Sequence, residues 1–389
     1  MTGREKIQAA FSKAGTPEIP AVICYEGIYY RDHWSQLTSA PWWSAQDPDI
    51  QRQVAWQSEA IEKTGQDWFC LPWCYAKEER DSLFIDETSA GVYLADRLTG
   101  ARRRLREPFV GGWDPERSYT QPDQVTGPRS FDEIDRAVPA DAPFQRGQFL
   151  ASGRGDLAAD MLRRFGERLF PIEYVDSPLW ACHNLWGFEG LMLQLCDRPD
   201  LVRHACERLL HNRCQWVRRA AAVGVAGIWI EECFTDSISP AQFAEFNVPV
   251  VRSLAEEIRA VGMKSVYYYC GNPADRWEHL LAVGADALSL EEGKKGFTID
   301  IEDVVARVQG RCTVLGNLDA INLLPRASED QLRAEIARQV AAGRKNGSRF
   351  IMSIGSPVTP QTNVRRVRRY CDLVHELSAG CSTEPLPPG

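Results

Sequence analysis

The sequence predicts an α/β protein: a (β/α)8 (TIM) barrel with an N-terminal helical region and an inserted hairpin segment. Apolar runs with the length of buried strands begin near residues 19, 67, 169, 227, 264, 285, 312 and 349. From residue 169 onward, each run is followed by a segment with helical spacing, which favours a parallel sheet covered by helices. Eight such units close into a barrel. A doubly wound open sheet is the alternative, and the absence of GxGxxG after the first strand weakens it.

Length and composition fit one globular domain. The chain has 389 residues, 44% hydrophobic and 25% charged, so we expect a single domain over residues 1–389 with a large core. The net charge of −8 argues against nucleic acid or an anionic membrane as a partner. Because no signal peptide and no apolar run of about 18 residues is present, we expect a cytoplasmic protein. Its twelve cysteines should then be reduced thiols.

The N-terminal half begins with helices and carries the insertion. We predict, in chain order, a surface helix at 2–15, a strand at 19–24, helices within 30–62, a strand at 67–73 and a helix at 155–167. Residues 77–145 are polar and rich in Arg, Pro and Gly, and they contain two strand-like runs at 83–86 and 91–95. This pattern indicates an inserted hairpin segment over the N-terminal strands.

The C-terminal half alternates regularly between strands and helices. Strands are predicted at 169–175, 227–232, 265–270, 285–291, 312–317 and 349–354. Helices are predicted at 187–222, 240–260, 273–283, 301–308, 328–343 and 361–378. Ser239-Pro240 is a typical helix start, with a capping serine and proline at the first helical position. The Pro-rich tail, 380–389, should be frayed.

The functional residues of such a barrel lie at the carboxyl ends of its strands. Those ends carry Tyr25, Glu26, Trp73, Cys74, Asp176, Glu231, Glu232, Cys270, Glu291, Glu292, Asn317 and Ser356. Three adjacent strands thus present carboxylate, thiol and carboxylate, a donor set that suits Zn²⁺. The alternative is that one Glu of each pair faces outward and the other forms a salt bridge with Lys294, Lys295 or an arginine of the barrel. In that case Cys270 is a core thiol, on the same strand face as Tyr268.

Aromatic and polar residues near the strand ends are candidates for substrate binding. We assign this role to Tyr25, Trp180, His183, Asn184, Trp186, Trp229 and Asn317. Aromatic rings suit an apolar substrate, or a methylated ammonium through cation–π attraction. His183, Asn184 and Trp186 follow Asp176-Ser-Pro178 and should lie at the mouth of the site. A satisfied surface histidine is an equally simple interpretation of His183.

Several short motifs in residues 170–380 occur in the same order in a known enzyme superfamily. They are Asp176-Ser-Pro178, Gly187-Phe-Glu-Gly-Leu-Met192, Ile238-Ser-Pro-Ala-Gln-Phe243, Cys270-Gly-Asn272, Gly284-Ala-Asp286, Gly316-Asn-Leu-Asp319, Gly355-Ser-Pro357 and Thr362-Asn-Val364. With these motifs the chain resembles the uroporphyrinogen decarboxylase superfamily, nearest its corrinoid-dependent (coenzyme M-type) methyltransferase branch. The resemblance implies a TIM barrel and a cytoplasmic enzyme.

The methyltransferase branch binds zinc, and its motif is degenerate in this chain. The branch has His-x-Cys on the strand that ends here at Cys270, and another Cys after the last strand. Tyr268 stands at the His position and Ser356 at the final Cys position. Glu292 follows Cys270 by 22 residues, a spacing similar to that of a Glu in cobalamin-independent methionine synthase, a more distant relative. The resemblance therefore implies a metal held by Cys270, Glu292 and Glu232, with Cys233 as a possible replacement ligand.

Three functions remain open at this point. The first is methyl transfer between a small O- or N-methyl substrate and a thiol or a corrinoid carried by a separate protein, with Zn²⁺ as Lewis acid. The second is a metal-free decarboxylase or lyase in which Glu232 or Asp176 is the acid–base group. Tyr268 is a further catalytic candidate. The third is a non-enzymatic binding protein. The decarboxylase branch has several arginines after its first strand, whereas Tyr25-Glu-Gly-Ile-Tyr-Tyr-Arg31 contains one. A homodimer is an open alternative to a monomer.

Overall fold

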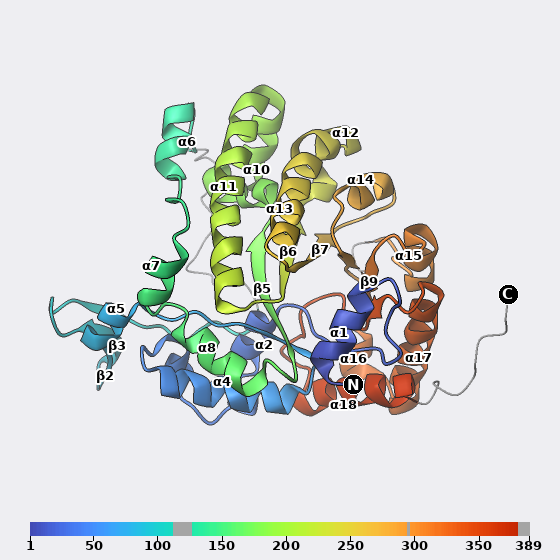
Figure 1. Ribbon diagram of the computed structural model, residues 1–389, viewed down its shortest axis with the longest axis horizontal. Coiled ribbons are helices and arrows are strands. Elements are labelled where there is room, and N and C mark those ends of the chain that lie inside the picture. Colours follow the sequence, from blue (N-terminus) through green and yellow to red (C-terminus); the bar gives the residue numbers. More distant parts are fainter. Residues whose placement is uncertain (112–126, 294–295, 380–389) are drawn as a thin grey trace.

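The computed structural model describes residues 1–111, 127–293 and 296–379, and its centre is a curved parallel sheet (Figure 1). Seven strands pair in the order β1-β5-β6-β7-β8-β9-β10. They are β1 (Trp68–Cys70), β5 (Phe170–Asp176), β6 (Gly227–Cys233), β7 (Lys264–Cys270), β8 (Ala287–Leu290), β9 (Thr313–Leu315) and β10 (Phe350–Ile351). Every neighbouring pair is parallel, which confirms the α/β barrel class.

An extended segment occupies the eighth place, where the sequence predicted a strand at 19–24. On one side Ala21 forms a parallel bridge with Met352, next to β10. On the other side the amide of Asp67, just before β1, donates to the carbonyl oxygen of Ala21 over 2.8 Å. The segment is not a regular strand because side chains satisfy its inner amides. Ala21 N–H donates to Asp67 Oδ2 at 2.7 Å and Ile23 N–H to Gln66 Oε1 at 2.9 Å.

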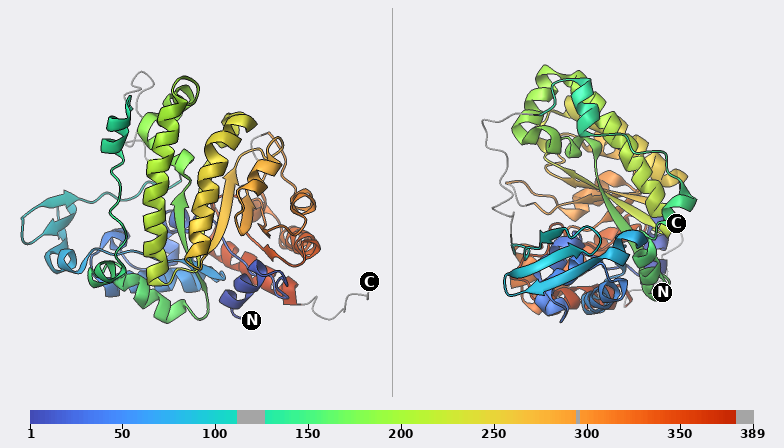
Figure 2. Two further views of the ribbon diagram at one scale, coloured as in Figure 1. Left: turned by 45° about the horizontal axis from the view of Figure 1, so that its top comes forward. Right: turned by 90° about the vertical axis from the view of Figure 1, so that its left-hand side faces the viewer.

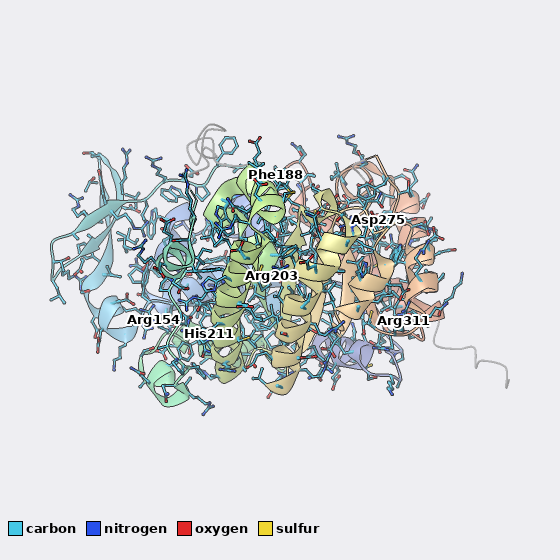
Figure 3. All side chains as sticks on the ribbon, turned by 90° about the horizontal axis from the view of Figure 1, so that it is seen from above. Arg154, Phe188, Arg203, His211, Asp275 and Arg311 are labelled. Carbon is cyan, nitrogen blue, oxygen red and sulfur yellow. The ribbon has the colours of Figure 1, made fainter. Side chains whose placement is uncertain are left out.

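Helices cover the outside of the sheet. The long ones are α4 (Ile50–Thr64), α8 (Asp156–Phe165), α10 (His183–Asp197), α11 (Pro199–Val223), α13 (Val248–Ala260), α15 (Ile301–Val308), α17 (Glu329–Lys345) and α18 (Val364–Ala379). Their outer faces are polar: Figure 3 shows Arg203 and His211 on the exposed face of α11. Short elements lie near the strand ends: α2 (Glu26–Asp32), α3 (Trp34–Leu37), η1 (Trp42–Gln46), α9 (Pro178–Ala181), η2 (Thr235–Ser237), α12 (Pro240–Gln242), η3 (Phe243–Asn247), α14 (Trp277–Ala282) and α16 (Leu323–Arg326).

Helix starts follow the capping chemistry that the sequence indicated. Ser239 caps α12 through the amide of Gln242, and Pro240 takes the first helical position as predicted. Helix α1 (Gly3–Phe11) covers the amino-terminal end of the barrel. It contacts β5 and β10, and Thr313 Oγ1 at the start of β9 donates to the carbonyl oxygen of Ala10 at 2.8 Å. The opposite end, where the strands finish, is left for a functional site.

The predicted insertion contains a three-stranded antiparallel sheet of β2 (Leu83–Thr88), β3 (Gly91–Asp96) and β4 (Arg102–Arg104). Helix α5 (Lys77–Ser82) precedes it, and α6 (Phe131–Ala137) and α7 (Arg146–Ala151) follow it. Figure 2 shows the β2–β3 ribbon projecting from the side of the barrel, while α6 and α7 pass along α11. The hairpin is confirmed. Residues 112–126 of the insertion and the tail at 380–389 lie outside the described residues.

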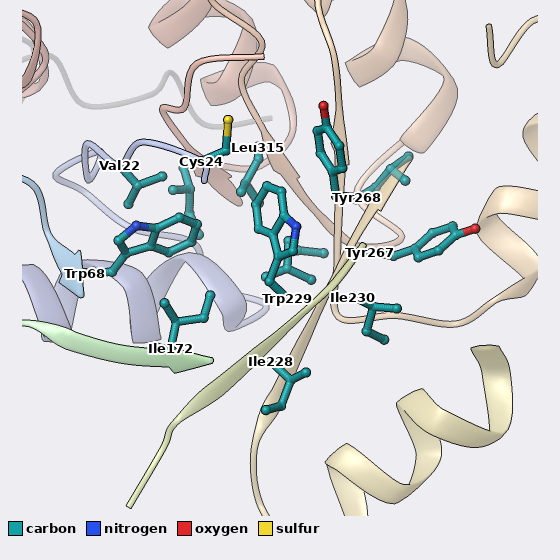
Figure 4. Packing of buried hydrophobic residues seen from close by; sticks show 14 of the residues in the cluster. Val22, Cys24, Trp68, Ile172, Ile228, Trp229, Ile230, Tyr267, Tyr268 and Leu315 are labelled. Carbon is teal, nitrogen blue, oxygen red and sulfur yellow. The ribbon is translucent and has the colours of Figure 1, made fainter. Parts of the chain in front are cut away.

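The barrel interior is aromatic. Figure 4 shows Trp229 and Tyr268 on one side of β6 and β7, and Ile230 and Tyr267 on the other. The Trp229 ring stacks on that of Tyr268 with centroids 4.9 Å apart, and meets the edge of Trp68 at 5.9 Å. All three side chains are buried. These rings form the floor beneath the carboxyl ends of the strands.

Candidate active site at the carboxyl ends of the strands

Two thiols meet where β6 and β7 end. The register of these strands pairs Glu231 with Tyr268 and Cys233 with Cys270. Since side chains alternate along a strand, Glu231 and Cys233 lie on the same inner face as Trp229. The Cys233 and Cys270 thiols lie close enough to interact, and this interaction together with burial raises the pKa of Cys233. Without a further cation, the pair is therefore stabilised in its protonated form.

Each thiol has a carboxylate beside it. The Sγ of Cys233 lies 3.5 Å from Glu231 Oε1, and the Sγ of Cys270 lies 3.2 Å from Glu291 Oε2. Burial raises the pKa of Glu231, and the charge of Asp176 raises it further. The hydroxyl of Tyr25 donates to Glu231 Oε1 at 3.1 Å and acts in the opposite direction. Each carboxylate is thus placed to accept the proton that its thiol would lose.

Hydrogen bonds connect the loops after β8 and β10 beside the thiols. Ser356 Oγ donates to Glu292 Oε2 at 2.8 Å, and the Tyr268 hydroxyl donates to the carbonyl oxygen of Gly355 at 3.0 Å. A Cβ on residue 355 would stand 2.4 Å from the backbone nitrogen of Glu292, so only glycine fits there. Asn317 is buried and donates to the carbonyl oxygens of Ile299 (2.8 Å) and Glu291 (3.4 Å). Asn317 therefore supports the Glu291 loop in this structure.

Tyr25 and Glu26, which are consecutive in the chain, point to two different places. Tyr25 has a left-handed backbone (φ 57°), and its ring meets Tyr268 edge-on at 5.5 Å. Glu26 turns away from the thiols and accepts hydrogen bonds from Gln66 Nε2 (2.8 Å), Tyr30 OH (3.0 Å) and Cys70 N–H (3.1 Å). Burial raises the pKa of Glu26 to about 7 despite these three donors.

The structure corrects the placement of Glu232. The sequence interpretation put it beside Cys270 as a metal ligand and as an acid–base group. Instead it lies on the helix side of β6, where Asn247 Nδ2 and the Tyr267 hydroxyl (3.3 Å) donate to its Oε2. Burial there raises its pKa to about 7. Strand alternation explains the difference, because Glu231 takes the inward position next to Cys233 and Glu232 must then face outward.

Asp176 and the Trp180–His183 pair surround the thiol cluster without joining it. Asp176 ends β5 half-exposed and pairs with Arg213 at 3.2 Å. The His183 ring stacks on Trp180 with centroids 3.8 Å apart, and its Nδ1 lies 2.6 Å from the Trp180 carbonyl oxygen. Trp180 and His183 line a small recess with Cys233 and Phe234. These rings therefore stand at the rim next to the thiol site.

Asn184 and Trp186 do not line the thiol site. Asn184 is exposed. Trp186 is buried, and its indole N–H donates to the carbonyl oxygen of Pro128, where the insertion returns to the barrel. The predicted position of Trp186 at the mouth is therefore corrected: this side chain anchors the insertion.

Sequence reasoning missed Glu231 as the inward carboxylate and gave Cys233 only as a replacement ligand. The signal was the alternation Trp229, Glu231, Cys233, which becomes decisive once Cys233 is paired with Cys270. Reasoning from the strand ends also missed the separate environment of Glu26. Lys294 and Lys295, which the sequence offered as partners of the glutamates, lie outside the described residues.

The donors fit zinc in type. Two thiols and two carboxylates, Cys233, Cys270, Glu231 and Glu291, match the ligands that zinc takes in proteins. Within residues 1–111, 127–293 and 296–379, no three His, Cys, Asp or Glu side chains are arranged as a ready metal site. Binding would therefore require the two thiol–carboxylate hydrogen bonds to open.

No helix in the described part of the chain is long and apolar enough to cross a bilayer.

Known proteins similar to this chain share its fold and part of its sequence. The family model described as uroporphyrinogen decarboxylase (URO-D) matches residues 125–377. A uroporphyrinogen decarboxylase of Pseudomonas aeruginosa (strain LESB58) is 27% identical over 195 residues, which is 49% of this chain and 53% of that protein. The corresponding protein of Janthinobacterium sp. (strain Marseille) is 25% identical over 221 residues, 53% of this chain and 59% of the relative. The chain thus spans about half the length of the curated relatives it matches.

A solved structure is similar over nearly the whole chain. A methyltransferase from Methanosarcina mazei superposes with a TM-score of 0.65, covering 97% of this chain and 99% of that one. The two sequences are 16% identical, so this similarity identifies the barrel fold.

Proposed function

The chain belongs to the uroporphyrinogen decarboxylase family, and we propose that within this family it is a methyltransferase. It would move a methyl group between a small O- or N-methyl substrate and an acceptor, either a thiol or a corrinoid carried by a partner protein. The observation that supports this most strongly is the Cys233–Cys270 pair with Glu231 and Glu291 at the carboxyl ends of β6, β7 and β8.

The four side chains provide a way to form and hold a thiolate. A thiolate, rather than a thiol, is the metal ligand and the nucleophile. When Cys270 loses its proton, Glu291 Oε2 at 3.2 Å is placed to accept it, and Glu231 Oε1 is placed in the same way for Cys233 at 3.5 Å. The carboxylates thus act as local proton acceptors, and Tyr25 keeps Glu231 oriented through its hydroxyl.

A zinc ion fits the proposal best. Cys233 and Cys270 would hold it, with Glu291 or Glu231 as a further ligand. When bound, zinc would act as a Lewis acid that lowers the pKa of a thiol acceptor. The protein itself would orient the reactants above the Trp229 and Tyr268 rings and keep bulk water out of this buried floor.

Decarboxylation is the second candidate, because the curated relatives carry that name. The charges of this chain argue against a polycarboxylate substrate. Arg31 is the single arginine in the segment Tyr25–Arg31, and it pairs with Asp32 at 2.6 Å. Recognition of several carboxylates needs convergent arginines. The described residues next to the thiols include the acidic Glu231 and Glu291, which would repel a polycarboxylate substrate.

The test is zinc-dependent transfer of a methyl group from free methylcobalamin to a small thiol. The purified full-length protein, with and without added Zn²⁺, is mixed with both reactants, and the thioether is quantified by mass spectrometry. The proposal predicts turnover that depends on enzyme and zinc. If no thioether forms while the same preparation decarboxylates uroporphyrinogen, the decarboxylase alternative is correct.

A further inference from the structure

A second cavity, of about 470 Å³, is lined by Glu26, the residue that follows Tyr25 in the chain. Five aromatic side chains line it: Tyr30, Trp34, Trp42, Trp56 and Trp73. They come from α2, α3, η1, α4 and the segment after β1. The volume is that of a small-molecule site. Four of these five side chains are tryptophans, whose indole rings can contact a ligand in the cavity.

The aromatic wall has a defined geometry. The Trp34 and Trp56 rings lie 4.7 Å apart at 43°, and Tyr30 meets Trp56 edge-on at 5.9 Å and 87°. The Trp34 indole N–H is directed away, to the carbonyl oxygen of Ala40 at 2.6 Å. Such rings attract a cation through their quadrupoles, most strongly when the cation has been desolvated.

The charges that line the cavity are mainly negative. Glu26, Asp32 and Glu107 contribute carboxylates, and Arg31 is the one basic residue among the described lining residues. Arg31 is already paired with Asp32 at 2.6 Å. The exposed Glu107 at the rim, and Glu26 (1% exposed) whenever it is ionised, therefore leave the cavity with an excess of negative charge.

We propose that this cavity binds an organic ammonium ion, with a methylated ammonium group against the tryptophans and Glu26 as its counter-charge. The binding itself stands on the cavity alone. Its meaning for catalysis rests on the proposed function, in which this cation is the methylated substrate. A fully methylated nitrogen has no N–H to donate, so aromatic faces and a nearby carboxylate are the groups that stabilise it.

The surroundings of Glu26 determine how a bound cation would change its protonation. Gln66, Tyr30 and the amide of Cys70 donate to its carboxylate. Its other titratable neighbours include Glu173, Tyr174 and the Cys70 thiol. Burial raises the pKa of Glu26 to about 7 in spite of the donors. A bound cation would favour the charged carboxylate, so binding should release a proton and strengthen as pH rises towards 7.

The consecutive residues Tyr25 and Glu26 connect the thiol site with the cavity. Tyr25 faces the thiols and Glu26 faces the cavity, and Cys70 also lines the cavity. The Tyr174 ring packs on Trp229 at 5.8 Å, and the Glu26 charge acts on its hydroxyl. A ligand in the cavity would thus lie next to the barrel floor.

The experiment measures binding of choline and of its neutral isostere 3,3-dimethylbutan-1-ol to the full-length protein by calorimetry. No methyl transfer is needed for this readout. Choline should bind about tenfold more tightly than the isostere. Trp42→Leu removes one lining indole and should weaken choline binding by about tenfold. Trp43→Leu, the matched control in the same η1 helix, removes an indole outside the lining and should leave binding within about twofold.

Glu26→Gln should abolish the preference for choline over the isostere, while thermal melting reports whether the variant is folded. If that variant does not fold, the Trp42 and Trp43 pair decides. Equal binding of the two compounds, no binding of choline, or equal effects of the two tryptophan variants would overturn the inference. If the protein prefers choline but transfers no methyl group, the proposed function is wrong and this inference stands. If it transfers methyl groups but shows no preference for choline, this inference is wrong and the proposed function stands.

Discussion

Cys233 and Cys270 occupy paired positions on adjacent parallel strands, and their thiols lie side by side at the carboxyl end of the barrel. Neither thiol is isolated, because Glu231 and Glu291 accept from them. As part of a core these four groups stabilise the fold little, because burying carboxylates costs free energy and apolar residues in their place would not have this cost. Their arrangement is more easily explained by a function that needs thiolate and carboxylate together.

The first prediction concerns zinc. Cys270→Ser should lower zinc affinity by more than about tenfold, because it removes a thiolate ligand and leaves one thiol. Cys312→Ser is the control, since Cys312 is a buried thiol at the start of β9, at the other end of the barrel. Metal analysis and the thiolate-to-metal band of the cobalt(II)-substituted protein provide the measurement. Less than about a tenth of an equivalent of zinc in wild type, with no thermal shift on adding zinc, would remove the metal from the account.

The second prediction separates the two adjacent glutamates. Glu231→Gln should slow methyl transfer strongly and change stability little, because its carboxylate faces the thiols. Glu232→Ala should change the methyl-transfer rate little but lower the free energy of unfolding by about 1–3 kcal/mol, because Asn247 and Tyr267 lose a buried partner. Urea unfolding and the methyl-transfer rate are measured on both variants. A catalytic defect confined to Glu232→Ala would contradict the inward orientation of Glu231.

The strand–helix alternation was enough to predict the barrel from residue 169 onward, because buried parallel strands leave near-continuous apolar runs. It was not enough for residues 19–24, where Asp67 and Gln66 side chains replace part of the backbone ladder. Such long-range bonds leave no local pattern.

Site prediction reached the right strand ends but not always the right side chain. Cys270 and Tyr268 were placed on one face by alternation, and the structure agrees. Glu231 and Glu232 differ by one residue, so choosing between them required the β6–β7 register. Trp186 was misplaced because its partner, Pro128, is 58 residues away in the insertion.

The third prediction is a pH dependence of stability from Glu26. Its carboxyl pKa rises from 4.5 to about 7 on folding, so the folded protein binds more protons between these two values. Stability must then fall as pH rises from about 4.5 to about 7, by an amount of the order of 3 kcal/mol from this group. Glu26→Gln lacks this contribution. The difference in unfolding free energy between wild type and variant should change accordingly from pH 5 to pH 7, and a constant difference would exclude the raised pKa.

The fourth prediction concerns the rim. His183→Ala removes a ring stacked on Trp180 at 3.8 Å beside the recess that reaches Cys233. Because His183 is partly exposed, the loss of stability should be below about 1 kcal/mol, while KM rises or kcat falls. Trp186→Phe is the comparison, since it loses the bond to Pro128 and should affect stability more than kinetics. Unchanged kinetics in His183→Ala would remove this residue from the site.

The most direct test of methyl transfer at the thiol pair follows a labelled methyl group. Zinc-loaded wild type, Cys270→Ser and Cys312→Ser are each incubated with trideuteromethyl-cobalamin and a small thiol, and the trideuteromethyl thioether is measured by mass spectrometry. Methyl transfer at the thiol pair predicts labelled product with wild type and Cys312→Ser, and a rate at least about a hundredfold lower with Cys270→Ser. Equal rates for wild type and Cys270→Ser, or no labelled product from any of the three proteins, would contradict it.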